Sequence, residues 1–175
     1  MVEIFRQMTD LPVTVLLGGG MRVLEREGVD LRSELEDHYT IVRDSAELAR
    51  VISDTTTTLF GLFAPGEMSP AAERSPTLPE MTRAALAVLQ RDPDGFFLMV
   101  EGAKIDHAAH RNDNPRAVME TIEFAKAVQK AIDWAAGRSD TLILVVADHE
   151  TGGLTVKADN GPGSFPTVSW STTTH

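Results

Sequence analysis

Two short clusters of carboxylate and imidazole side chains in this sequence could hold a metal ion. In the first, Asp106 and His110 lie four residues apart, with Glu101 five residues before Asp106. In the second, Asp148 and His149 are adjacent. Carboxylate oxygens and imidazole nitrogens bind zinc at about 2.0–2.2 Å, and a spacing of four across a turn brings both donors to one cation. Each cluster alone is more typical of an exposed surface pair than of a metal site, so the interpretation depends on the elements around them.

Each cluster follows a short apolar run that is typical of a buried strand. The runs cover residues 96–100 and 141–147, and a helix with Ile122 and Ile132 on its apolar face is predicted between them, over residues 115–136. This order predicts a βαβ unit with a right-handed crossover, in which both strands end at the same edge of the sheet. Open α/β sheets place their sites at that edge. The sequence therefore predicts a metal site there, with the first cluster on a loop.

The rest of the chain alternates between apolar strand patterns and helix starts. Asp44 with Glu47, and Thr77 with Glu80, have the spacing of a capping box at the start of a helix. The patterns predict strands over residues 12–17, 39–42 and 57–63, helices over 45–50 and from 77 to about 91, and extended segments over 155–157 and 167–170.

Composition limits the classes of partner and of metal. The formal net charge is −10, which argues against nucleic acid and anionic membranes as partners. The chain has no cysteine, so a metal would be held by carboxylate and imidazole, which suits zinc, magnesium or manganese. No signal peptide is recognisable in residues 1–10, and no apolar run reaches the length of a transmembrane helix.

Longer runs around both clusters resemble the alkaline phosphatase family. They read Glu101-Gly-Ala-Lys-Ile-Asp-His-Ala-Ala-His110 and Ala147-Asp-His-Glu-Thr-Gly-Gly153, and further matches lie at residues 15–20, 59–63 and 76–81. The resemblance covers most of the chain. It implies an α/β fold: a three-layer α/β/α sandwich with a mostly parallel sheet, present here as a single, incomplete domain over residues 1–175.

The resemblance also implies an activity and a set of ligands. The activity is hydrolysis of phosphate monoesters through a phosphoserine intermediate, with two zinc ions and one magnesium ion. The implied magnesium ligand is Glu101, the first zinc takes Asp106, His110 and His175, the second zinc takes Asp148 and His149, and His107 lies near the phosphate.

No nucleophilic serine is expected in this chain. The family pattern around that serine is Asp-Ser-Ala-x-Thr, and Asp44-Ser45-Ala46 copies three letters of it at a position where the family is variable. The start of a helix explains Asp44 and Ser45 without chemistry. We therefore expect the chain to be an internal piece of a larger enzyme, with at most one well-held zinc and no serine-based turnover by itself.

Two alternatives remain open from the sequence. One is a related two-metal hydrolase, such as a sulfatase, phosphodiesterase or phosphomutase, and the other is a metal-binding fragment without catalysis. For the intact family member the resemblance implies an exported protein, periplasmic or secreted, that is often a homodimer.

Overall fold

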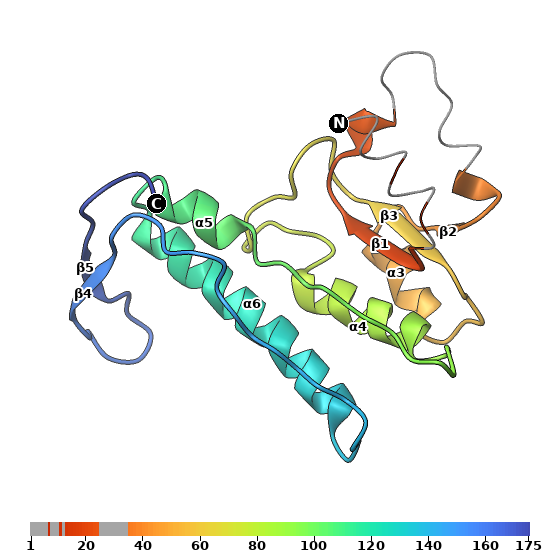
Figure 1. Cartoon of the computed structure of the whole chain (residues 1–175). Helices are drawn as coiled ribbons and strands as arrows, with labels where there is room; N and C mark the ends of the chain where they lie inside the picture. The colour runs from red at the N-terminus through yellow and green to blue at the C-terminus, as the bar shows by residue number, and fades with distance from the viewer. Residues whose placement is uncertain (1–6, 8–10, 12, 25–34) are drawn as a thin grey trace. The chain divides into compact units, whose positions relative to one another are not determined.

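The structure is a computed structural model that describes residues 7, 11, 13–24 and 35–175 (Figure 1). The chain forms two compact units. The first contains the described residues up to Ser69 together with Glu73–Met99, and the second contains Pro70–Ala72 and Val100–His175. The single domain expected over residues 1–175 stays a prediction.

The first unit is built on a three-stranded parallel sheet. Strands β1 (Val15–Gly18) and β2 (Thr40–Ile41) flank β3 (Leu59–Leu62), so the order is β1-β3-β2. Both outer strands pair with β3 in parallel. The three predicted upstream strands are confirmed, although each is shorter than its apolar pattern and residue 12 lies outside the described residues.

Successive side chains of β3 enter two different apolar clusters, as the period of two in a strand requires. Leu59 packs with Leu48 and Val88, which come from the helices on one face of the sheet. Phe60 packs with Leu35 and other residues on the opposite face. Leu59 and Phe60 are both almost fully buried, which makes β3 the centre of this unit.

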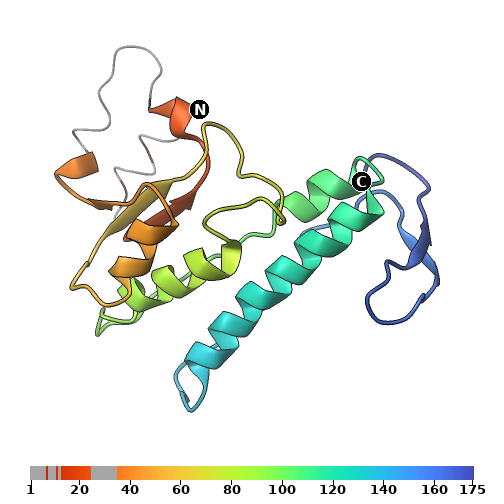
Figure 2. The ribbon, with the colours of Figure 1, turned by 180° about the vertical axis from the view of Figure 1, so that it is seen from behind.

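Helices α3 (Ser45–Val51) and α4 (Leu78–Leu89) cover one face of this sheet (Figure 2). The capping box of α4 is complete, because Thr77 Oγ1 accepts from the Glu80 N–H and the Glu80 carboxylate accepts from the Thr77 N–H. In α3, Asp44 caps the Glu47 N–H at 2.8 Å, but the Glu47 carboxylate accepts from the Arg43 N–H, one residue earlier than in a capping box.

The second unit consists of a helix pair and a small hairpin. Helix α5 (Lys104–Ala109) packs on α6 (Asn114–Ala135), and β4 (Thr155–Ala158) pairs antiparallel with β5 (Thr167–Ser169). The helix predicted over residues 115–136 is confirmed. Its buried residues, however, are Ala117, Glu120, Glu123 and Ala127, while Ile122 and Ile132 are exposed.

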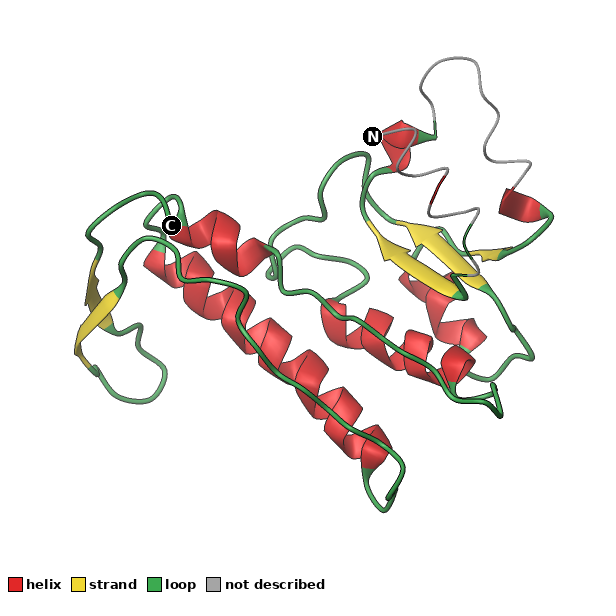
Figure 3. Ribbon diagram, viewed as in Figure 1, coloured by secondary structure: helices red, strands yellow, loops and turns green. Residues whose placement is uncertain are grey.

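The two predicted buried strands are wrong. Residues 96–100 and 141–147 run as extended chain drawn as loop in Figure 3, and neither belongs to a sheet among the described residues. Phe97 is 90% exposed, and Leu142 and Val146 are each 80% exposed. A strand requires a hydrogen-bonding neighbour as well as an apolar pattern, and the described residues supply none here. The predicted βαβ unit and its right-handed crossover are therefore not formed.

None of the helices in the described part of the chain combines the length and apolar character that a membrane-spanning segment needs.

Candidate metal centre

The first predicted cluster lies on a helix and not on a loop. Asp106 and His107 lie within α5, and His110 is its C-cap residue. The His110 N–H donates to the Asp106 carbonyl at 2.9 Å, so the spacing of four places both side chains on one helical face. Gly102, before the helix, lies so close to the Phe124 ring of α6 that an added Cβ would be 3.1 Å from it. This close packing holds α5 on α6.

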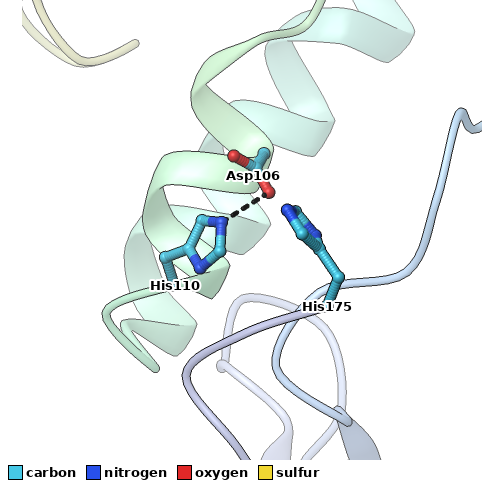
Figure 4. A group of neighbouring side chains, drawn as sticks. All are labelled: Asp106, His110 and His175. Carbon is cyan, nitrogen blue, oxygen red and sulfur yellow. Dashed lines mark ion pairs between the residues drawn. The ribbon is translucent and has the colours of Figure 1, made fainter.

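Three side chains converge at the end of α5. The ligand atoms of Asp106, His110 and His175 all lie within 4.8 Å of one another. Asp106 Oδ1 is 3.4 Å from His110 Nε2, and the His110 and His175 rings meet edge to face with centroids 4.8 Å apart. In Figure 4 the carboxylate faces both imidazole rings. One carboxylate and two imidazoles form the three-ligand donor set of a catalytic zinc, which keeps a further position open.

His175 reaches the cluster because the segment before it is held by Gly152. The Gly152 N–H donates to the Thr174 carbonyl at 2.9 Å, and the Gly152 carbonyl accepts from the N–H groups of Ser171 and Thr172. Gly152 has a φ of +87°, and an added Cβ would lie 2.6 Å from the Trp170 ring. Only glycine fits this backbone conformation and this close approach.

The second predicted cluster adjoins the first. Asp148 Oδ2 lies 3.3 Å from His149 Nε2, and the His149 ring packs edge to face against His175 with centroids 4.0 Å apart. Asp148 is largely exposed, whereas His149 is partly covered. The neighbouring Glu150 carboxylate accepts from the N–H groups of Gly153 and Leu154, which closes the turn after the cluster.

The groups around Asp106 change the pKa of its carboxyl. Partial burial by itself would raise the pKa of this carboxyl. The hydrogen bond from Thr151 and the positive charge of the surrounding histidines outweigh burial and hold the Asp106 pKa below its usual value; these histidines are His110, His149 and His175. The carboxylate is therefore favoured in the ionised form that a metal ligand requires.

Two of the predicted site residues lie outside this cluster. Glu101 is exposed and precedes α5 by three residues. His107 follows Asp106 on α5, so its side chain leaves the helix about 100° away from that of Asp106. Neither is a member of the group of described residues that could hold a metal ion, and their roles stay predictions.

Thr151 is a residue of the site that the sequence did not reveal. Its hydroxyl lies within hydrogen-bonding distance of Asp106, His149 and His175, and the residue is buried. A threonine beside an Asp-His pair carries no signal of its own in a single sequence, because threonine is common at turns.

Comparison with known proteins identifies the family. The sequence pattern of the alkaline phosphatase family matches residues 2–174. The chain is 38% identical over 151 residues to alkaline phosphatase 3 of Bacillus subtilis (strain 168), which covers 84% of this chain and 32% of that protein.

Solved structures give the same result for the fold. Alkaline phosphatase from the Antarctic bacterium TAB5 superposes with a TM-score of 0.84 at 27% identity, covering 99% of this chain and 54% of that one. A variant of the TAB5 enzyme with Mg bound in its M3 site superposes with a TM-score of 0.82 at 28% identity, with the same two coverages.

A parallel α/β sheet and a carboxylate–imidazole cluster are thus found in a chain that matches one family along nearly its whole length. The chain belongs to the alkaline phosphatase family. The predicted fold class, an incomplete alkaline-phosphatase-like α/β fold with a mostly parallel sheet, is confirmed. The chain spans about a third of the length of its Bacillus subtilis relative.

Proposed function

We propose that Asp106, His110 and His175 hold a zinc ion. The observation that carries this proposal is the convergence of their ligand atoms within 4.8 Å, from two segments more than 60 residues apart. The donor set fits zinc, because it combines one ionised carboxylate with two imidazoles and leaves a position open. When bound, zinc supplies Lewis-acid stabilisation of phosphate oxygens and lowers the pKa of bound water to about 7.

Asp148 and His149 would contribute to a second zinc position. Support comes from the His149 ring, which packs directly on the ring of His175, a donor of the first proposed position. Glu101 would provide one ligand for magnesium. The family resemblance assigns two donors of this chain to the second zinc position and one to the magnesium position, so we expect both to be weaker than the first in this chain.

The function that follows is hydrolysis of phosphate monoesters by the whole protein, through a phosphoserine. In this reaction the residues of this chain would hold the cations, and His107 would lie near the phosphate. We do not assign the nucleophile to Ser45. Ser45 is the first residue of α3 in the first unit, and its Oγ lies 2.7 Å from Ser75 Oγ. Its environment is that of a helix start, in which the adjacent Asp44 carboxylate caps the Glu47 N–H.

Metal content and turnover test the proposal separately. Zinc bound by the purified chain would be measured by elemental analysis after dialysis, and turnover would be measured with p-nitrophenyl phosphate. We expect about one tightly held zinc per chain and no turnover above that of free zinc. A chain that retains no zinc would overturn the metal centre. Robust turnover that survives Ser45→Ala would show that a nucleophile is present elsewhere.

The double variant Asp106→Asn, His110→Ala is the matched loss-of-site control, because it removes two donors from one helical face. His38→Ala serves as the neutral control, since His38 is exposed and lies in the first unit. Equal zinc content in the double variant and the wild type would mean that zinc is bound elsewhere.

A further inference from the structure

The Thr151 hydroxyl contacts donors of both proposed zinc positions. Its Oγ1 lies 2.8 Å from Asp106 Oδ1, 3.0 Å from His175 Nδ1 and 3.1 Å from His149 Nδ1. The residue is only 9% exposed, so water does not readily replace these contacts. Thr151 itself offers a hydroxyl and a methyl group, neither of which is expected as a zinc ligand.

Counting protons assigns a direction to each of these three contacts. A hydroxyl has one proton to donate and two lone pairs that accept. The ionised Asp106 carboxylate only accepts, so the hydroxyl proton belongs to the contact with Asp106. The hydroxyl then has only lone pairs left for the two imidazoles. Both His149 and His175 must therefore donate to it through an Nδ1–H.

An independent contact supports this assignment for His149. His149 Nδ1 also lies 3.2 Å from the Glu150 carbonyl oxygen, and a backbone carbonyl can only accept. The same reasoning applies to His110, whose Nδ1 lies 2.6 Å from the Thr173 carbonyl oxygen. In all three neutral rings the proton is thus on Nδ1, and the lone pair is on Nε2.

We propose that Thr151 is a positioning residue that holds His149 and His175 in the Nδ1–H form, so that both rings present the Nε2 lone pair to a cation. A neutral imidazole otherwise exchanges between its two tautomers, and the hydrogen bond at the other nitrogen decides which one binds metal. By orienting Asp106 as well, one hydroxyl aligns donors of both proposed zinc positions. This inference rests on the proposed metal centre.

The substitutions Thr151→Val and Thr151→Ser provide a matched test. Valine keeps the shape and removes the hydroxyl, whereas serine keeps the hydroxyl and removes the methyl group. Zinc affinity would be measured on the whole chain by competition with a chromophoric chelator. We expect Thr151→Val to weaken zinc binding by about 10–100-fold, the usual effect of losing an outer hydrogen-bond partner, and Thr151→Ser to stay within about threefold of wild type.

The tautomers give a readout that a purely structural role would not change. Nitrogen NMR of the metal-free chain, at a pH where the rings are neutral, distinguishes Nδ1–H from Nε2–H in each histidine. We expect wild type to show Nδ1–H at His110, His149 and His175. In Thr151→Val we expect His175 to shift toward the other tautomer, whereas His110, held by a backbone carbonyl, stays unchanged.

The possible failures of the two proposals are distinguishable. If wild type binds no zinc, the metal centre is wrong, and the tautomer spectrum still tests Thr151 by itself. If wild type binds zinc and Thr151→Val binds it equally tightly with unchanged histidine signals, the role of Thr151 is overturned. If Thr151→Val fails to fold, the wild-type spectrum decides, because Nε2–H at His149 and His175 contradicts the proposal.

Discussion

At the scale of single residues, the Asp106 carboxylate is the group with which the other polar side chains of the cluster interact. It accepts from Thr151, pairs with His110 and lies in the positive field of two further histidines. The site is thus arranged around one ionised carboxylate, with the imidazoles as its neighbours.

His175 is expected to matter as much for zinc binding as His110 does. Both are donors of the same three-residue group, and an outer hydrogen-bond partner already accounts for about 10–100-fold in affinity. We expect His175→Ala and His110→Ala each to weaken zinc binding by at least about 100-fold in chelator competition. His38→Ala should leave affinity unchanged. An unaltered affinity in His175→Ala would remove that residue from the site.

The Asp106 pKa also gives stability a pH dependence with a definite sign. The folded-state pKa lies below the unfolded-state value of about 3.9, so the stabilising contribution is complete above that value and is lost as the pH falls through the folded-state pKa. In urea titrations of metal-free protein between about pH 5 and pH 3, the free energy of unfolding should therefore fall more in wild type than in Asp106→Asn. Equal losses in the two proteins would contradict this expectation.

At the scale of elements, the sequence predicted the helix caps and the three upstream strands, and it failed at two apolar runs that have no strand partner among the described residues. The caps at Asp44 and Thr77 and the helix after residue 114 were predictable, because a cap and its helix lie within a few residues. Residues 96–100 and 141–147 were predicted as strands from apolar runs alone. Their exposure still alternates, since Leu142 and Leu144 are more exposed than Ile143, so the chain is extended but unpaired.

The candidate site shows the same division. The two motif runs pointed to Asp106, His110, Asp148 and His149. The first two lie in one group with His175, His149 packs on the His175 ring, and Asp148 pairs with His149. The contribution of Thr151 was not predictable, because it depends on a hydroxyl meeting groups 45 and 24 residues away in the sequence. Such a contact leaves no spacing pattern.

The capping box of α4 is expected to contribute measurably to stability. Thr77→Ala removes the acceptor for the Glu80 N–H, which should cost about 1 kcal/mol of the free energy of unfolding. Thr77→Ser keeps the acceptor and should recover most of that loss. Urea titration monitored by circular dichroism measures both. An unchanged free energy of unfolding in Thr77→Ala would mean that water replaces the cap without cost.

The Gly152 turn should matter for zinc binding more than the turn at Gly161, although both glycines have positive φ. Gly152 and Gly161 have φ of +87° and +81°, so alanine is strained by about 1–2 kcal/mol at either. An added Cβ meets the Trp170 ring at Gly152 but has nothing within 4 Å at Gly161. We expect Gly152→Ala to weaken zinc binding by about 10-fold or more, through displacement of His175, and Gly161→Ala to leave it unchanged. Equal zinc affinities would refute the link between this turn and the site.

At the scale of the whole molecule, large apolar side chains are exposed in the described part of a chain whose net charge is −10. Residues 141–147 are apolar except for Thr141 and contain neither charge nor proline, which is the composition of a segment prone to pair with other strands. Like charges on the surface oppose association, and salt screens that repulsion.

We therefore expect the chain to self-associate, and to do so more at high salt, as measured by light scattering at increasing sodium chloride. The triple variant Leu142→Lys, Leu144→Lys, Val146→Lys places three charges on the exposed side of the segment and should suppress association. A control triple variant would add the same charge at exposed polar positions outside the segment, namely Thr57, Ser139 and Ser164. If both triple variants behave alike, net charge and not the apolar segment controls association.

The contact between His110 and the segment that carries His175 has a consequence for how the chain folds. His110 and Thr173 are 63 residues apart, and the proposed cation would bridge the same two ends. An ion bound there acts as a crosslink that closes a long loop, and the entropy lost on closing such a loop grows only slowly with its length. Because the unfolded chain does not preserve this arrangement, free energy released on binding zinc becomes free energy of folding. The melting temperature of the chain should then follow the concentration of free zinc, so that metal supply sets how much of this chain is folded.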